Sequence, residues 1–132
     1  MNYLLDTHTF LWTISNIENL SKKALEVIKN QKNEIFISAV SLWEISIKVR
    51  INKLDLDNIE PEELISLAEK MEFQLIGLSP EEAVTYYKLK EETHKDPFDR
   101  MLIWQSISRN IPIISKDTEF NKFIPHGLNL IW

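Results

Sequence analysis

The chain lacks cysteine altogether and contains only two glycines, Gly77 and Gly127, in 132 residues. Without cysteine it has no disulfide, no thiolate zinc site and no cysteine nucleophile. Two isolated glycines cannot form a glycine-rich phosphate loop or a dinucleotide-binding fingerprint, since both motifs need several glycines at fixed spacing. Several large enzyme classes are therefore excluded before any positive feature is considered.

Long hydrophobic runs are also missing. No apolar stretch approaches the roughly 20 residues that a membrane span needs, and the first residues have neither the basic segment nor the apolar length of a signal peptide. Hydrophobic residues make up 44% of the chain, which is ordinary for a globular protein. We expect a soluble cytoplasmic protein, with residues 1–132 forming one domain.

The net charge is -5, which argues against broad electrostatic binding of nucleic acid. A cluster of carboxylates would also lower the net charge, however, and a bound metal ion would neutralise such a cluster.

Short apolar runs alternate with segments of helical periodicity, a pattern that predicts an α/β domain with a mainly parallel sheet. The expected strands are residues 2–6, 34–38, 73–76, 111–115 and, at the edge, 128–131. The expected helices follow a short turn at 9–12 and cover residues 22–30, 41–51, a segment opened by Pro61, a segment opened by Ser79-Pro80, and 96–109. Ser21 and Asp96 are the expected N-caps of two of them.

Four acidic residues stand beside these strands and helix starts: Asp6, Glu44, Asp99 and Asp117. The carboxyl ends of parallel strands meet at one edge of a sheet, which is where open α/β sheets bind ligands. Four carboxylates at that edge would repel one another unless a cation lay among them. Oxygen ligands of this kind suit Mg²⁺ or Mn²⁺.

Each acid also has a simpler structural interpretation. Ser41-x-x-Glu44 matches a capping box, and Glu44 has the spacing to pair with Lys48 one turn later. Asp99 would stabilise a helix start that Asp96 caps, and Asp117 would cap a short turn. Asp6 is the hardest to explain structurally, because a carboxylate at a buried strand end is unfavourable unless it is paired or bound to metal.

Hydroxyl groups fall at the same strand ends, in Thr7, Ser38 and Ser115, where they would hold metal-bound water. Such a site suits metal-assisted cleavage of a phosphodiester, in which the ion activates water and stabilises the developing charge.

Three blocks of sequence resemble the signature segments of PIN-domain proteins, and the VapC-like toxins of bacterial toxin–antitoxin pairs above all. They are Leu4-Leu5-Asp6-Thr7-His8-Thr9-Phe10-Leu11-Trp12, Ser38-Ala39-Val40-Ser41-Leu42-Trp43-Glu44-Ile45-Ser46-Ile47-Lys48 and His94-Lys95-Asp96-Pro97-Phe98-Asp99-Arg100-Met101-Leu102. Ser115-Lys116-Asp117 forms a weaker fourth block. The blocks are in order and extend over nearly the whole chain.

The resemblance implies a three-layer α/β/α fold and an endoribonuclease that depends on Mg²⁺ or Mn²⁺. Asp6, Glu44 and Asp99 match the three core acids of the family, and Asp117 matches its more variable fourth. The family's cleavage products carry a 3′-hydroxyl and a 5′-phosphate, which fits attack by a metal-activated water. A homodimer and an inhibitory antitoxin are the expected partners.

A few further residues are candidates for contact with substrate or with the metal's surroundings: Thr7, His8, Ser38, Asp96, Arg100 and Ser115. Lys48, Arg50 and Lys53 form a modest basic stretch that would either steer RNA phosphates or simply face solvent. Two other functions stay open: a catalytically silent module that binds RNA or protein, and a phosphatase of the haloacid-dehalogenase-like type. The second is disfavoured because His8 stands where such enzymes have a second acid.

Overall fold

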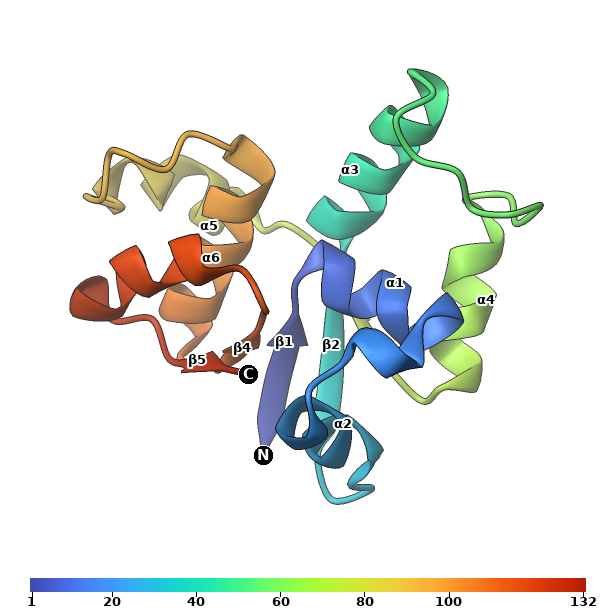
Figure 1. Ribbon diagram of the computed structural model, residues 1–132. Coiled ribbons are helices and arrows are strands. Elements are labelled where there is room, and N and C mark those ends of the chain that lie inside the picture. The colour runs from blue at the N-terminus through green and yellow to red at the C-terminus, as the bar shows by residue number, and fades with distance from the viewer.

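Five short parallel strands form the centre of the computed structural model, which covers residues 1–132 (Figure 1). They are β1 (Asn2–Leu5), β2 (Glu34–Ser38), β3 (Gln74–Ile76), β4 (Ile113–Ile114) and β5 (Leu130–Ile131). Their order in the sheet is β3-β2-β1-β4-β5, and every neighbouring pair is parallel. The predicted α/β class and parallel sheet are confirmed.

Helices cover both faces of this sheet. Successive side chains of a strand point to opposite faces, so apolar strands present hydrophobic side chains on both. On β1, Leu4 faces one core and Leu5 the other, and Ile113 and Ile114 divide in the same way on β4. The core that contains Leu5 packs against α1 (Thr7–Ser15), α2 (Lys22–Lys29), α3 (Ala39–Arg50) and α4 (Glu63–Lys70). The core that contains Leu4 packs against α6 (Pro97–Arg109) and the 3₁₀ helix η3 (Thr118–His126). The result is the expected three-layer α/β/α arrangement.

Three shorter helical elements complete the chain: η1 (Ile17–Asn19), α5 (Pro80–Thr85) and η2 (Tyr86–Lys88). No helix of the protein combines the length and the apolar character needed to cross a bilayer.

Polar caps fix where the helices begin. Ser21 accepts a hydrogen bond from the N–H of Ala24, and Asp96 accepts one from the N–H of Asp99, so both predicted N-caps are confirmed. Ser38 caps α3, so that helix begins at Ala39 directly after β2. The capping-box interpretation of Ser41 and Glu44 is therefore wrong, because both residues lie inside the helix and not at its start.

The strand order reverses beside β1. From β1 the chain adds β2 and β3 on one side, and β4 and β5 are added on the other. The carboxyl ends of β1 and β4 are neighbours, with Leu5 opposite Ile114 in the ladder. A reversal of this kind leaves a crevice at the carboxyl edge, and Asp6 follows β1 at that point.

Candidate active site

Asp6 lies at the carboxyl end of β1 and is only 5% exposed. One carboxylate oxygen accepts the N–H of Thr9 at 2.9 Å, which makes Asp6 the N-cap of α1. The other accepts a hydrogen bond from the hydroxyl of Ser115, at the end of β4. Burial raises the pKa of Asp6, although these hydrogen bonds act in the opposite direction. Asp6 therefore has a structural role as a cap, which the sequence did not suggest, and its charge is costly without a counter-ion.

Glu44 comes from the second turn of α3 and is also buried, with 2% of its surface exposed. The hydroxyl of Thr7 donates to Oε1 at 2.6 Å, and the ammonium of Lys48 lies 2.5 Å from Oε2. Because the single hydroxyl hydrogen of Thr7 goes to Glu44, the hydroxyl of Ser41, 3.0 Å away, is the donor to Thr7. The predicted pairing of Glu44 with Lys48 is confirmed.

Asp99 is in the first turn of α6, behind the cap residue Asp96. Its Oδ2 lies 3.0 Å from Nε2 of His94. Burial raises the pKa of Asp99 to about 6; the hydrogen bond with His94 opposes this rise, while the negative charges of Asp96 and Glu44 add to it. Asp96 and Glu44 are thus close enough to Asp99 for their negative charges to act on it.

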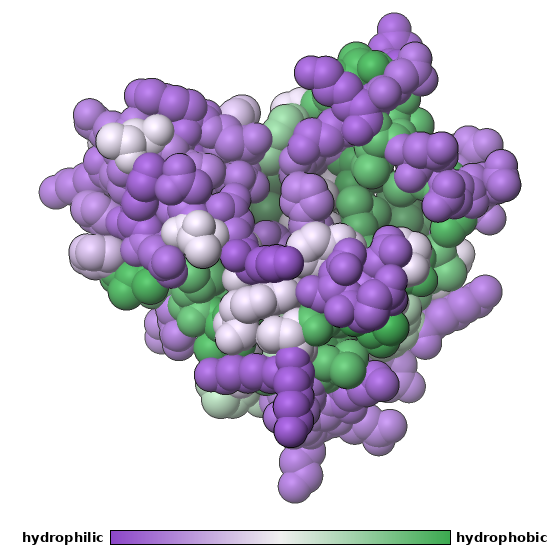
Figure 2. Space-filling view, viewed as in Figure 1, coloured by the Kyte–Doolittle hydropathy of each residue, from purple (hydrophilic) through white to green (hydrophobic).

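Lys48 is the counter-ion of this acidic group. Its pKa is raised by its hydrogen bond to Glu44 and, against the effect of burial, by the negative charges of Glu44, Asp96 and Asp99. In the space-filling view a notch separates the lobe that contains α6 from the lobe that contains α3 (Figure 2). Trp43 is 62% exposed on α3 and packs edge-to-face on Phe98 of α6, with ring centroids 5.3 Å apart.

Asp117 lies at the same edge of the sheet, but it is exposed and its carboxylate caps η3 through the N–H of Glu119. Its own N–H donates to the hydroxyl of Ser115, the same hydroxyl that donates to Asp6. Its interpretation as a cap is confirmed. Asp117 is joined to the other acids through Ser115, not by a direct contact.

Ser38 and Arg100 are engaged within the fold. The hydroxyl of Ser38 donates to the side-chain oxygen of Gln105 at 2.6 Å and so ties β2 to α6. The guanidinium of Arg100 donates to the hydroxyl of Tyr86 and to three backbone carbonyls, those of Leu89, Glu91 and His94. Arg100 thereby holds the segment before α6 in place, including the histidine that contacts Asp99.

His94 is the site residue that the sequence pattern did not single out. It belongs to an irregular segment, where spacing carries no information about contacts, and it reaches Asp99 across five residues. Its ring packs edge-to-face on Phe120 and Phe123, with centroids 6.1 and 5.9 Å away. The signal in the sequence is its position at the start of the block that also contains Asp99.

The chemistry of these donors fits a hard divalent cation, since they are carboxylate and hydroxyl oxygens and two of the carboxylates have raised pKa values. In their present positions, no three His, Asp or Glu side chains are close enough to hold one metal ion.

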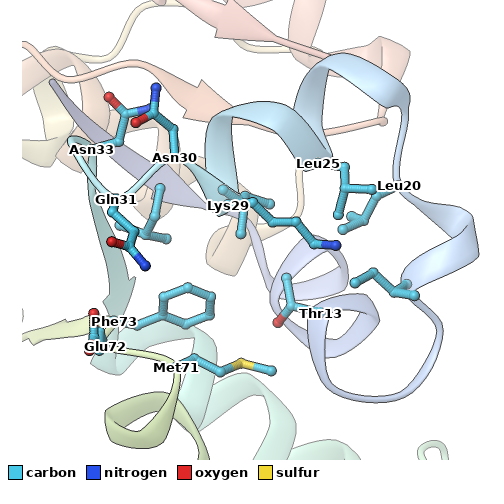
Figure 3. A pocket seen from close by; sticks show the side chains of 13 residues that line it. Thr13, Leu20, Leu25, Lys29, Asn30, Gln31, Asn33, Met71, Glu72 and Phe73 are labelled. Atoms are coloured by element: carbon cyan, nitrogen blue, oxygen red, sulfur yellow. The ribbon is translucent and has the colours of Figure 1, made fainter.

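The cavity shown in Figure 3 is remote from these acids. It has a volume of about 280 Å³ and lies at the opposite, amino-terminal edge of the sheet, between α2 and the turn before β3. None of the predicted site residues lines it. Its apolar lining, with Leu20, Leu25 and Phe73, continues the hydrophobic core.

Comparison with known proteins decides the family. The model of the PIN domain family matches residues 3–124, almost the whole chain. The chain belongs to the PIN domain family. The resemblance of its motif blocks to PIN proteins is thereby confirmed, and the haloacid-dehalogenase-like alternative loses its support. No curated protein matches the sequence significantly.

Solved structures show the same PIN fold. Chains in three VapBC structures each cover 99% of this chain and 97–98% of their own length: VapBC2 from Rickettsia felis bound to a DNA fragment from its promoter (TM-score 0.72, 19% identity), VapBC-1 from nontypeable Haemophilus influenzae (0.70, 17%) and DNA-bound VapBC from Salmonella typhimurium (0.66, 20%). At these identities the likeness establishes the fold alone.

Proposed function

We propose that this PIN domain is a metal-dependent endoribonuclease and acts in the cytoplasm as the toxin of a toxin–antitoxin pair. The proposal is supported above all by the PIN family match over residues 3–124, taken together with the acids of the motif blocks: Asp6 and Glu44 are buried, and Asp99 is partly buried with a raised pKa. Buried acids with raised pKa values in a crevice are typical of functional sites.

In this proposal Asp6, Glu44 and Asp99 hold one or two Mg²⁺ or Mn²⁺ ions, with Asp117 as the fourth acid. A bound divalent ion lowers the pKa of water and stabilises negative charge on a phosphate. Ser115 and Thr7 orient the carboxylates of Asp6 and Glu44 through their hydroxyls.

The neighbouring residues have positioning roles. His94 fixes the rotamer of Asp99, and the ammonium of Lys48 compensates the negative charge of Glu44 until metal binds. Asp96 stays a helix cap that adds negative charge to the site. Asp6 and Glu44 are in addition each bound by a hydroxyl from another element of the fold, that of Ser115 and that of Thr7.

The partners in this proposal are RNA, an antitoxin and a second copy of the chain. The structural neighbours are VapBC assemblies, which supports an antitoxin partner. RNA as substrate and the homodimer rest on the resemblance of the motif blocks.

The decisive experiment is cleavage of a panel of RNAs by the purified chain with Mg²⁺, with Mn²⁺ and with EDTA. We expect metal-dependent cuts that leave 3′-hydroxyl and 5′-phosphate ends, and a loss of at least a hundredfold in rate for Asp6→Asn and Asp99→Asn. Asp57→Asn is the matched control, because it makes the same chemical change on the exposed segment between α3 and α4. Equal cleavage by all four proteins would refute the proposal.

A second candidate is a catalytically silent PIN module that binds RNA or protein. It is favoured by one observation, namely that no three potential ligands converge and Lys48 occupies Glu44. Calorimetric titration with Mn²⁺ alongside the cleavage panel separates the two, since metal binding without any cleavage supports the silent module.

A further inference from the structure

A second cavity lies beside the acidic group, between α1 and the C-terminal half of α3, and it is lined without a single acidic residue. Its volume is about 270 Å³, and its walls are Thr7, His8, Leu11, Ile45, Lys48, Lys53 and Leu54. Its only charged side chains are Lys48, which is paired with Glu44, and Lys53, which forms no ion pair, so the net positive charge of the cavity comes from Lys53. A positive cavity favours an anion.

This cavity shares a wall with the candidate active site. Thr7 and Lys48 both line it. Thr7 also donates to Oε1 of Glu44, and the ammonium of Lys48 contacts Oε2 of the same carboxylate. An ammonium group has three donors, so the bond to Glu44 leaves Lys48 two further hydrogens for a ligand. An anion in the cavity would therefore lie one side chain away from Glu44.

The end of α3 builds the second lysine into the cavity. Asn52 adopts a left-handed conformation with φ of 59°, its N–H donates to the carbonyl of Val49 at 3.1 Å, and the N–H of Lys53 donates back to the carbonyl of Lys48 at 2.8 Å. These two hydrogen bonds are those of a Schellman motif, which reverses the chain over the last turn of a helix. The turn returns Lys53 to the side of α3 that carries Lys48.

His8 closes the cavity from α1. It is exposed in the first turn of the helix, and its ring contacts that of Trp12 one turn later, with centroids 6.0 Å apart. Because His8 lines the cavity, an imidazole N–H can donate to an oxyanion bound there.

The geometry points to a phosphate subsite: this cavity binds a backbone phosphate of an RNA strand, next to the phosphate that the acids act on, through Lys53, Lys48 and His8. The inference rests on the proposed function for the identity of the strand. Cation contacts to phosphates position a nucleic acid without reading its sequence, so the subsite holds the strand in register for cleavage.

The test measures binding separately from cleavage. In a cleavage-deficient Asp6→Asn background, fluorescence anisotropy follows a labelled single-stranded RNA over a range of KCl concentrations. Lys53→Gln and His8→Gln are compared with Lys29→Gln, which removes a lysine from the remote cavity at the other edge of the sheet. Urea unfolding of each variant verifies that it is folded.

We expect Lys53→Gln to weaken RNA binding by about threefold to tenfold and to reduce the slope of log K against log [salt] by about 0.7, the loss of one single-strand phosphate contact. His8→Gln weakens binding by a smaller factor, and Lys29→Gln has no effect. If Lys53→Gln and His8→Gln bind RNA with the affinity and salt slope of the background protein, the subsite is refuted.

A parallel cleavage assay uses the same variants without the Asp6→Asn substitution. It distinguishes refutation of the subsite from refutation of the proposed function. Cleavage by the parent with unchanged RNA binding in both variants overturns the subsite alone. Absence of metal-dependent cleavage by the parent overturns the proposed function itself.

Discussion

The ammonium of Lys48 lies 2.5 Å from the carboxylate of Glu44, one helical turn earlier in α3, and the negative charges of Glu44, Asp96 and Asp99 all raise its pKa. Glu44 is 2% exposed, so this pair neutralises a charge that the fold would otherwise bury alone. The same contact places Lys48 in competition with any divalent ion for Glu44. We therefore expect the pair to affect both the stability of the fold and the proposed affinity for metal.

Replacing Lys48 by methionine separates these two effects. We expect the free energy of unfolding to fall by about 2 kcal/mol, because the buried carboxylate of Glu44 loses its partner. This loss is smaller than that for a fully buried ion pair, since Lys48 is partly exposed. Mn²⁺ affinity should rise, by roughly tenfold for a competing interaction of about 1.4 kcal/mol. Urea unfolding and calorimetric titration measure the two quantities, with Lys29→Met as the control. Unchanged values of both would contradict this account of the pair.

Asp6 combines a helix cap with a proposed metal ligand, and two substitutions distinguish the roles. Asn caps a helix as well as Asp does and removes a buried charge whose pKa is raised by burial, so Asp6→Asn should be at least as stable as the parent at pH 7, while Asp6→Ala, which loses the cap, should be less stable than Asp6→Asn by about 1 kcal/mol. Both should lose Mn²⁺ binding. Thermal and urea unfolding give the first comparison and calorimetry the second. Full Mn²⁺ affinity in Asp6→Asn would leave Asp6 as a cap only.

The sheet was predictable because its strands are short apolar runs between turns. The prediction of residues 34–38 is confirmed to the residue by β2, and β1 ends one residue earlier than predicted because Asp6 leaves the ladder to cap α1. The helix expected from 41 begins at Ala39, since Ser38 is both the last residue of β2 and the cap of α3. A strand that passes directly into a helix leaves no turn residues for sequence analysis to detect.

The acids of the candidate site could be predicted from the sequence more readily than the side chains that contact them, and their catalytic role stays a prediction. Glu44 and Lys48 are four residues apart on one helix, where spacing fixes contact. His94 contacts Asp99 from an irregular segment, which Arg100 holds in place by donating hydrogen bonds to three backbone carbonyls of that segment. Such a segment has no periodicity from which the contact could be predicted. Arg100 itself was expected to contact substrate, but its guanidinium donates to groups within the fold.

The pKa of Asp99 is about 6 in the folded protein against 3.8 for an ordinary aspartate, which predicts that ionisation of this carboxyl lowers the free energy of unfolding. Between pH 3.8 and 6 the folded protein binds this proton more tightly than the unfolded chain does, so this group lowers stability as pH rises through that window. Asp99→Asn removes the ionisable carboxyl and with it this destabilisation. We expect the variant to be more stable than the parent by about 1–2 kcal/mol at pH 7, after allowance for partial exposure, and equal to it below pH 4.

Urea unfolding of the parent, Asp99→Asn and the control Asp57→Asn over pH 4–8 checks this expectation. A variant that is less stable than the parent at pH 7 would mean that the contact with His94 outweighs the repulsion from Asp96 and Glu44.

Glu82 gives the opposite pH dependence, far from the acids of the site. Burial alone would raise its pKa, but hydrogen bonds from Arg109, from the N–H of Ser79 and from Gln105 outweigh burial and hold the pKa at about 2, against 4.5 for an ordinary glutamate. The Arg109 contact is 2.6 Å long and joins the start of α5 to the end of α6. Because the folded pKa is depressed, this stabilisation is complete above pH 4.5 and is lost as pH falls from 4.5 through 2.

Glu82→Gln should therefore lower the free energy of unfolding by about 2 kcal/mol at pH 7, since Gln preserves the capping box with Ser79 but removes the charge that Arg109 pairs with. The difference from the parent should shrink as the pH is lowered from 4.5 towards 2. Glu81→Gln, exposed on the same helix turn, is the matched control and should differ little from the parent at any pH. Denaturant unfolding at pH 7, 4.5 and 3 measures the three proteins. A difference between Glu82→Gln and the parent that stays constant over this range would show that Glu82 stabilises the fold by packing and not by charge.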